Sequence, residues 1–262
     1  MKNIIMVILA HNDPDSLADL VKNTRHFCPI SRLMLYNSGI DHSLGKRLDL
    51  EILSISSQQL YAKITPFFFD VFEWFVKNGD TYDYIINLET DMLFIRHGYE
   101  EWVTSEMSGY DYMAPNLVKF VSPKSKWRPY KSLRPELSNW YDFFGFKYVH
   151  GAFSPGQIFS QRYVESIVTH KQYSELKRLI AENKSYTLQE ILFPTFPDAL
   201  CLAAKSYPSE LKPVIRYRPY HAVSGIKRAI NTPNAYFVHP VGREPDNLAR
   251  LLIHSLQEKS RL

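Results

Sequence analysis

The sequence of 262 residues has few cysteines, and its charge is nearly balanced. Each of these features excludes a class of protein. Cys28 and Cys201 are too few for a disulfide framework or a cysteine-based zinc site, so a reducing compartment is expected. The net charge of +4 is too small for the dense basic face of a nucleic-acid-binding protein. It permits an anionic partner such as a nucleotide, a charged glycan or a phospholipid surface.

The sequence also lacks a run of roughly 20 apolar residues, the length that a membrane-spanning helix requires. A short basic and apolar stretch opens the chain, but it breaks at His11–Pro14 without the small-residue cleavage site of a signal peptide. We therefore expect a cytoplasmic protein, with peripheral contact to a membrane as an option. The sequence makes no prediction about oligomeric state.

Apolar runs alternate with helical patterns over the first hundred residues. The run Asn3–Ala10 is typical of a strand buried on both faces, and Asp13 and Pro14 then supply the N-cap and the first residue of a helix. The next predicted elements are strands at Arg32–Asn37 and Leu50–Ile55, a helix at Phe67–Lys77 and a strand that ends at Glu89. This order predicts an α/β fold, a single domain with a mostly parallel central sheet flanked by helices.

The rest of the chain is richer in proline and in basic residues. Lys119–Arg134 is predicted to be a loop, either solvated or able to close over a ligand or to steer an anionic acceptor or membrane surface. The remaining predicted elements are strands at Tyr110–Pro115 and Ala152–Ser160 and helices at Gln161–Thr169, Ser174–Glu182, Thr187–Phe193 and Pro245–Lys259. Pro194 and Pro197 are expected to stop the helix that begins at Thr187.

Two carboxylates, Glu89 and Asp91, interrupt an apolar stretch where the fourth strand is expected to end. In an extended chain, side chains two residues apart point the same way, so the pair can converge on one cation or one sugar phosphate. Unpaired in a dry core, each would cost several kcal/mol, so a compensating partner is required. That partner is either a divalent cation bridging a pyrophosphate or, in the plainer interpretation, water or an arginine.

The stretch Ile86–Phe94, together with the first strand and its His-Asn-Asp-Pro loop, resembles a nucleotide-sugar-dependent glycosyltransferase of the GT-A type. Such enzymes carry Asp-x-Asp at the end of the fourth strand, and here Glu89 replaces the first aspartate. The resemblance implies that Asp91 ligates Mn²⁺ or Mg²⁺ and that Glu89 contacts ribose or sugar hydroxyls. It also places Ala10, His11 and Asn12 near the uracil or ribose.

The second half extends the resemblance, distantly, to the core-2/I-branching N-acetylglucosaminyltransferases. His150–Ser160 looks like the segment that walls the donor sugar and the acceptor, where Gly151 allows close backbone approach or simply makes a turn. Glu190 matches the acidic residue that acts as catalytic base in inverting enzymes, with Asp198 as the fallback. The alternative is a capping box, in which Glu190 bonds only the backbone N–H of Thr187.

A late histidine and several basic residues complete the resemblance. His239 is the candidate for a further metal ligand, although a histidine at a strand end is more often a simple hydrogen-bonding residue. Lys227, Arg228 and Arg243 are candidates to neutralise a diphosphate leaving group. Because the core-2/I-branching enzymes use basic side chains in place of a metal, a metal-independent mechanism stays open.

The resemblance implies a hexosyl- or N-acetylhexosaminyltransferase that moves a sugar from a UDP-sugar or similar donor to a glycan or glycolipid hydroxyl, with inversion, in bacterial-type glycan or polysaccharide synthesis. Residues 1–115 would form the nucleotide-sugar-binding half and residues 116–262 the acceptor-binding and catalytic half of one domain. A sugar-phosphate nucleotidyltransferase is disfavoured because the loop after the first strand has neither glycine nor lysine. A non-catalytic glycan-binding protein on the same scaffold is the remaining alternative.

Overall fold

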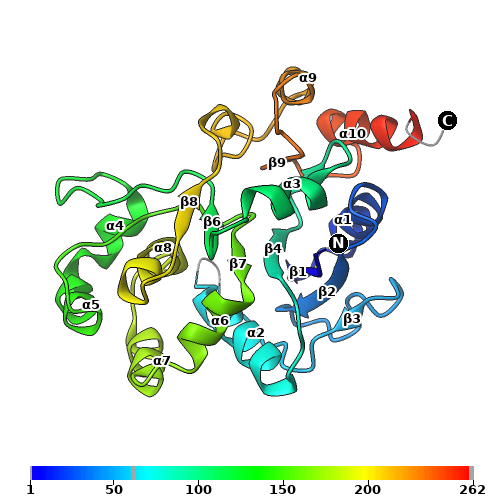
Figure 1. Ribbon diagram of the computed structural model, residues 1–262. Helices are drawn as coiled ribbons and strands as arrows, with labels where there is room; N and C mark the ends of the chain where they lie inside the picture. Colours follow the sequence, from blue (N-terminus) through cyan, green and yellow to red (C-terminus); the bar gives the residue numbers. More distant parts are fainter. Residues whose placement is uncertain (1, 61–62, 260–262) are drawn as a thin grey trace.

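A seven-stranded sheet forms the centre of the computed structural model, which describes residues 2–60 and 63–259 (Figure 1). The strand order is β3-β2-β1-β4-β7-β6-β8. The first four strands in this order are mutually parallel and β8 is parallel to β6, whereas β7 is antiparallel to both of its neighbours. The predicted mostly parallel α/β sheet is therefore confirmed. The strands are β1 (Ile4–Ala10), β2 (Arg32–Asn37), β3 (Glu51–Ile52), β4 (Tyr84–Glu89), β6 (Tyr112–Ala114), β7 (Ile158–Ser160) and β8 (Ala204–Ser206).

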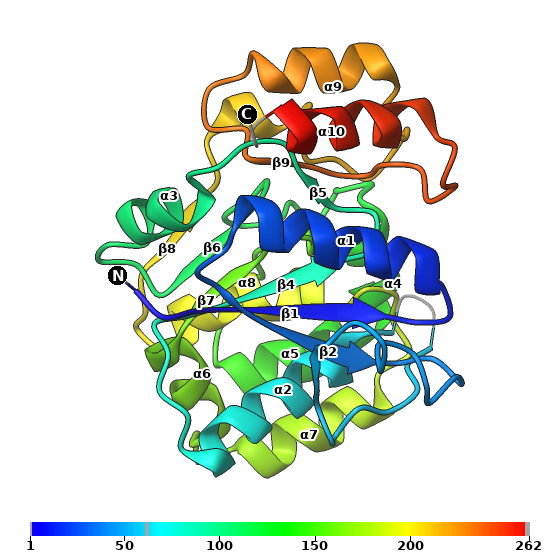
Figure 2. The ribbon, with the colours of Figure 1, turned by 90° about the vertical axis from the view of Figure 1, so that its right-hand side faces the viewer.

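Helices cover both faces of this sheet, giving the three layers seen in Figure 2. One face is covered by α1 (Pro14–Phe27), α3 (Tyr99–Glu106), α9 (Val223–Ile230) and α10 (Leu248–Lys259). The other is covered by α2 (Thr65–Asn78), α4 (Arg128–Leu133), α5 (Leu137–Phe144), α6 (Gln161–Val168), α7 (Tyr173–Glu182) and α8 (Gln189–Ala199). None of the helices within the described ranges is long and apolar enough to cross a membrane.

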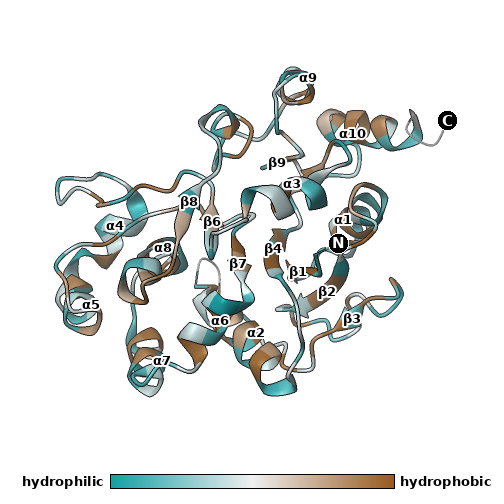
Figure 3. Cartoon of the chain, viewed as in Figure 1, coloured by the Kyte–Doolittle hydropathy of each residue, from teal (hydrophilic) through white to brown (hydrophobic). Residues whose placement is uncertain are grey.

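The apolar run of β1 is explained by burial on both faces of the sheet. Its even-numbered side chains belong to the core beneath α1, and its odd-numbered side chains belong to the core beneath α2. Figure 3 shows the same pattern, with hydrophobic colour on the central strands and hydrophilic colour on outward helix surfaces. Because β1 is parallel to β2 and to β4, the carboxyl ends of these three strands lie at one edge of the sheet, where ligands bind in open α/β sheets.

Helix α8 differs from its prediction because it continues through Pro194 and Pro197 to Ala199. A proline leaves the carbonyl four residues earlier without its helical donor. Here both carbonyls have other partners: the N–H of Ala152 donates to Glu190 O at 2.8 Å, and the hydroxyl of Tyr163 donates to Phe193 O at 2.7 Å. Tertiary hydrogen bonds therefore maintain a helix that the local sequence would end.

Other boundaries also differ. The basic segment Lys119–Arg134, predicted to be a loop, includes α4. The strand expected at Ala152–Ser160 is confined to β7, and α3, α5 and α9 were not predicted. A second sheet joins β5 (Leu93–Phe94) to β9 (Phe237–Val238), two short strands whose pairing partner is distant in the sequence. Elements this short carry too few residues for a recognisable period.

Candidate active site

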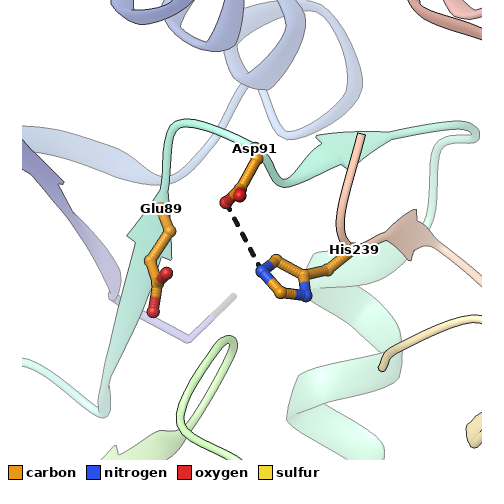
Figure 4. Close-up of side chains that lie close together, drawn as sticks. All are labelled: Glu89, Asp91 and His239. Atoms are coloured by element: carbon orange, nitrogen blue, oxygen red, sulfur yellow. Dashed lines mark ion pairs between the residues drawn. The ribbon is translucent and has the colours of Figure 1, made fainter. Parts of the chain in front are cut away.

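The paired acids lie where β4 ends, as predicted, but not in extended chain. β4 stops at Glu89, and a turn follows in which the N–H of Met92 donates to the Glu89 carbonyl at 2.9 Å. Asp91 is buried, with 3% of its surface exposed, whereas Glu89 is half-buried. The turn brings the two carboxylates toward one space, as Figure 4 shows.

His239 reaches the same space because of the small second sheet. β5 follows the acid turn and pairs antiparallel with β9, with Leu93 opposite Val238. The next residue after Val238, His239, therefore faces the turn, and the N–H of Val241 donates to the Asp91 carbonyl at 2.9 Å. Chain pairing across roughly 145 residues thus places an imidazole beside the acids.

The three side chains form a compact set of ligand atoms. One oxygen of Glu89, one of Asp91 and a ring nitrogen of His239 all lie within 4.8 Å of one another. His239 Nδ1 lies 2.8 Å from the Arg216 carbonyl, to which it donates, so Nε2 is directed at Asp91 Oδ1, 3.4 Å away. A backbone bond that fixes the ring in this way is typical of histidines that ligate a metal.

The electrostatics of the group favour a bound cation. Burial raises the pKa of Glu89 to about 7, and the negative charge of Asp91 adds to this shift. Burial also opposes ionisation of Asp91, but His239 and Arg243 outweigh it, so the pKa of Asp91 is lowered. Burial lowers the pKa of His239, yet the two carboxylates more than compensate and raise it. The two carboxyl groups are therefore held so close together that Glu89 resists ionisation, and a bound cation would favour the charged form of both.

The residues present fit a divalent cation. Within the described part of the chain, the buried Asp91 Oδ1 forms no hydrogen bond, and its ion-pair contact is His239 Nε2 at 3.4 Å, so this oxygen can still take a closer ligand. Two carboxylates and an imidazole are common ligands of divalent metals, and the remaining positions would stay open to a ligand. Arg243 Nη2 lies 3.4 Å from Asp91 Oδ2. An arginine therefore also compensates one of the two acids, as the plainer interpretation of the sequence predicted.

A buried arginine connects the acid turn to the C-terminal segment. Arg250 Nε donates to Gly242 O at 2.9 Å, and Nη2 lies 3.5 Å from Thr90 O. Its charge is balanced by Asp19 of α1. α1, α10 and the turn at residues 89–92 are thereby tied together, which fixes both the acids and the neighbouring Arg243.

Glu190, the predicted base, lines the same pocket as the acids. It lies in the first turn of α8 and is 8% exposed. Burial raises its pKa to about 8, opposed by the backbone amide of Ser154 and reinforced by the charge of Glu89. Asp198 lies outside this pocket and accepts hydrogen bonds from His150 Nε2 at 2.8 Å and the Tyr148 hydroxyl at 3.1 Å. The geometry therefore favours Glu190 over the fallback.

The capping box that was the alternative role for Glu190 does not form among the described residues. Among the residues that the structure describes, no side-chain hydrogen bond caps α8, whose N-cap is Leu188. The hydroxyl of Thr187 donates to the Tyr186 carbonyl at 2.8 Å instead. Thr187 itself has φ of 52°, a left-handed conformation that is unusual for a β-branched residue. The Glu190 carboxylate is thus not occupied by its own helix terminus.

The loop after β1 contributes one side chain to the pocket. His11 lines it, and its Nδ1 lies 2.6 Å from Ser38 Oγ. Ala10 is buried and its carbonyl accepts from Ser38, whereas Asn12 is exposed and its Oδ1 accepts from the N–H of Ile40 at 3.0 Å. Ala10 and Asn12 therefore shape this corner of the site without lining the pocket.

Gly39 is required for this corner. A Cβ atom there would lie 2.2 Å from the His11 carbonyl oxygen and from Asn12 Oδ1, well inside contact distance. We expect Gly39→Ala to destabilise the protein by roughly 1–3 kcal/mol and to weaken the nucleotide binding that the family resemblance implies, because the β1 loop must move. Thermal unfolding and calorimetry with a nucleoside diphosphate measure both effects.

Gly79→Ala is the matched control. Gly79 has a left-handed backbone, with φ of +66°, but a Cβ atom added there would meet no atom within 4 Å, and the residue closes α2 away from the pocket. The variant should lose stability without losing nucleotide affinity. Equal loss of affinity in both variants would contradict a specific role for Gly39.

The structure brings some predicted residues together and leaves others apart. His11, Glu89, Asp91, Glu190, His239 and Arg243 line one pocket of about 190 Å³. Gly151 lies outside this pocket. A Cβ atom there would lie 2.5 Å from the Trp127 ring, so the backbone of Gly151 closely approaches a side chain and not the predicted ligand. Lys227 and Arg228 are exposed on α9 and do not line the pocket.

Arg218 lines the pocket and was not predicted. Its guanidinium lies 4.2 Å from the centroid of the Tyr220 ring, and its Nη2 donates to the Tyr220 hydroxyl at 3.1 Å. The sequence signal was the aromatic setting of this arginine, with Tyr217 and Tyr220 on either side. A charge held by two rings is better positioned than one on a free helix surface.

Comparison with solved structures identifies the fold. No protein-family model matches the sequence, and no curated protein matches it. An active-site mutant of LgtC superposes with a TM-score of 0.55 at 11% identity, covering 97% of this chain and 95% of LgtC. The chain has a GT-A-type fold. The bifunctional glycosyltransferase WbbM superposes with a TM-score of 0.54 at 10% identity, and the match covers 98% of this chain and 52% of WbbM.

A second LgtC structure, of the galactosyltransferase in complex with donor and acceptor sugar analogues, has a TM-score of 0.49 at 10% identity. The match with the LgtC mutant spans nearly the whole of both chains, so the GT-A-type fold is not limited to the β1–β4 region. The resemblance that the sequence suggested is therefore confirmed at the level of the fold.

Proposed function

We propose that this protein transfers a sugar from a nucleotide-diphosphate sugar, with UDP-sugars as the first donors to test, to a hydroxyl of a glycan or glycolipid. The observation that carries the proposal is one pocket containing two different acidic features. At one side, Glu89, Asp91 and His239 converge at the carboxyl edge of the sheet. At another, Glu190 is buried without a competing cap. The GT-A-type fold and the glycosyltransferase neighbours support the same function.

In the proposed mechanism, Glu190 is the base of an inverting transfer. Its carboxylate takes the proton of the acceptor hydroxyl while that oxygen attacks the anomeric carbon. The bond from the anomeric carbon to the diphosphate breaks, and the bonding electrons leave with the diphosphate. Arg218 and Arg243, both lining the pocket, would stabilise the charge that grows on this leaving group.

Asp91 and His239 are the proposed ligands of Mn²⁺ or Mg²⁺, with Glu89 either beside them as a third ligand or bonded to ribose or sugar hydroxyls. When bound, the cation supplies positive charge that neutralises the donor diphosphate. Arg218 and Arg243, which line the same pocket, would supply further positive charge to this region.

The proposal is tested by incubating the purified protein with Mn²⁺ or Mg²⁺ and a panel of nucleotide sugars, and following release of nucleoside diphosphate. Turnover or slow hydrolysis with at least one donor is expected. Absence of any release, together with no binding of a nucleoside diphosphate by calorimetry, would remove the proposal. Release of pyrophosphate from a nucleoside triphosphate and a sugar phosphate would favour a nucleotidyltransferase instead.

The rate should rise with pH if Glu190 is the base. A carboxylate with a pKa of about 8 is mostly protonated below that pH and cannot accept a proton. We expect kcat/KM to fall about tenfold for each pH unit below about 8 and to level off above it, because this ratio reports the free enzyme. A profile that is flat from about pH 6 to 9 would contradict the assignment of Glu190 as base.

A further inference from the structure

Basic residues are concentrated in one part of the chain outside the active site. Residues 116–150 contain seven Lys and Arg residues and only two acidic residues, whereas the whole chain has a net charge of +4. Lys119, Lys124, Lys126 and Lys147 are exposed, and none of them forms an ion pair with a residue in the described ranges. This part of the surface therefore presents uncompensated positive charge.

Exposed apolar side chains lie among these lysines. Val118 is 53% exposed and Phe120 is 59% exposed. The ring of Phe120 contacts that of Tyr148 at 4.7 Å, and Tyr148 stacks on Phe146 at 4.3 Å. We call Val118, Lys119, Phe120, Lys124, Lys126, Phe146, Lys147 and Tyr148 the cationic aromatic patch.

The backbone of the patch is fixed. Val118 pairs with Gly151 through two hydrogen bonds of 2.7 and 3.0 Å, and the N–H of Phe120 donates to His150 Nδ1 at 2.9 Å. Arg134 donates to the carbonyls of Pro123 and Ser125, which holds the segment that carries Lys124 and Lys126. The exposure of Phe120 is thus built into ordered structure.

We propose that the cationic aromatic patch docks on an anionic lipid surface. Phe120 and Val118 would enter the headgroup boundary, while the lysines contact anionic headgroups. The exposed apolar groups match the apolar interior of such a membrane, and the unpaired lysines match its anionic headgroups. A sugar platform fits less well, because Phe146 and Tyr148 already stack on each other and leave fewer free ring faces. The nearby carboxylate of Asp198 is engaged by His150 and Tyr148.

The patch also adjoins the active-site wall. Gly151 pairs with Val118, and the next residue, Ala152, donates its N–H to the carbonyl of Glu190 at 2.8 Å. Docking would therefore bring the pocket near a lipid-linked acceptor. This last consequence rests on the proposed function, but the docking itself does not.

Vesicle flotation of the full chain, without nucleotide, tests the docking. We expect binding to phosphatidylcholine vesicles that contain phosphatidylglycerol and no binding to pure phosphatidylcholine. Replacing Lys119, Lys124 and Lys126 with Glu should weaken binding by at least about a hundredfold. Phe120→Ser should weaken it by about tenfold. Lys22, Lys46 and Lys77, exposed elsewhere, replaced together with Glu provide a control with the same change in net charge, and Ile40→Ser, 70% exposed, is the control for Phe120.

Loss confined to the patch variants, with the controls still bound, supports the proposal. No binding to anionic vesicles, equal binding to neutral vesicles, or equal loss in patch and control variants would overturn it. Binding to a soluble anionic polysaccharide in place of vesicles would overturn it as well. Nucleotide binding by the patch variants, measured by calorimetry, should match that of the parent protein, so failure of docking is distinguishable from failure of the proposed catalysis.

Discussion

Glu190→Gln is expected to lower kcat by a factor of about 10²–10⁴ and at the same time to make the protein more stable at alkaline pH. The rate falls because an amide cannot accept the proton of the acceptor hydroxyl. Glutamine keeps the size of the side chain, so the pocket wall should be preserved. Initial rates with a soluble acceptor and the thermal unfolding midpoint measure the two effects on the same preparation.

The rise in stability follows from the pKa of Glu190. In the unfolded chain this carboxyl has a pKa near its ordinary value of 4.5, and folding raises it to about 8. Between these values the folded protein binds the extra proton, so unfolding becomes easier as the pH rises. Charging the buried group costs on the order of a few kcal/mol above about pH 8. Glutamine removes that cost, and the difference should vanish below about pH 4.5.

Glu101→Gln is the matched control for this experiment. Glu101 is exposed on α3 and does not line the pocket. Its replacement should leave turnover unchanged. A Glu190→Gln variant that is destabilised at high pH and loses little activity would indicate a structural role for Glu190.

The sequence predicted those parts of the site that depend on local pattern. β1 and β4 have long apolar runs, so their ends could be located, and with them His11, Glu89 and Asp91. The two acids were expected to share one direction in extended chain, yet the turn after Glu89 brings them together instead. The two carboxylates therefore meet because of a turn and not because of an extended strand, and the alternation of side chains along the sequence could not reveal this turn.

The parts that depend on long-range pairing were less predictable. His239 was a candidate only through the family resemblance, because its position depends on β5 and β9, which are two residues long each. Arg218 and Lys227 show the same limit, since both are basic residues in the last quarter of the chain and only Arg218 lines the pocket. The tyrosines that flank Arg218 in the sequence are the only local feature that separates it from Lys227 on its exposed helix, and they do not reveal which residue reaches the pocket.

The prolines of α8 illustrate a second kind of limit. Pro194 and Pro197 correctly signal lost helical hydrogen bonds, but Ala152 and Tyr163 replace the missing donors from other elements. One of these replacements joins α8 to the wall segment at the very residue proposed as base. The two prolines therefore correctly indicated the loss of helical hydrogen bonds, but the local sequence did not indicate the tertiary hydrogen bonds that replace them.

Asp91→Asn is expected to have the largest effect, with kcat/KM falling by at least about a thousandfold. It removes one charge from the proposed cation site while keeping the shape of the side chain. The parent protein should gain thermal stability on adding Mn²⁺, because a ligand that binds only the folded state stabilises it, and the variant should not. Asp142→Asn, at an exposed position on α5, is the control and should retain both properties.

Asp91→Asn should also change stability in the opposite direction to Glu190→Gln. The pKa of Asp91 is lowered in the folded protein, so its charged form contributes stability above pH 3.8 that is lost as the pH falls through the folded pKa. Asparagine loses the interaction with His239 and leaves that ring buried beside Glu89, for a cost of roughly 1–3 kcal/mol at neutral pH. Two acids in one pocket would thus both be needed for turnover, one stabilising the fold and the other destabilising it. If Asp91→Asn kept its response to Mn²⁺ and its turnover, the acid turn would be a structural feature and the donor would have to bind elsewhere.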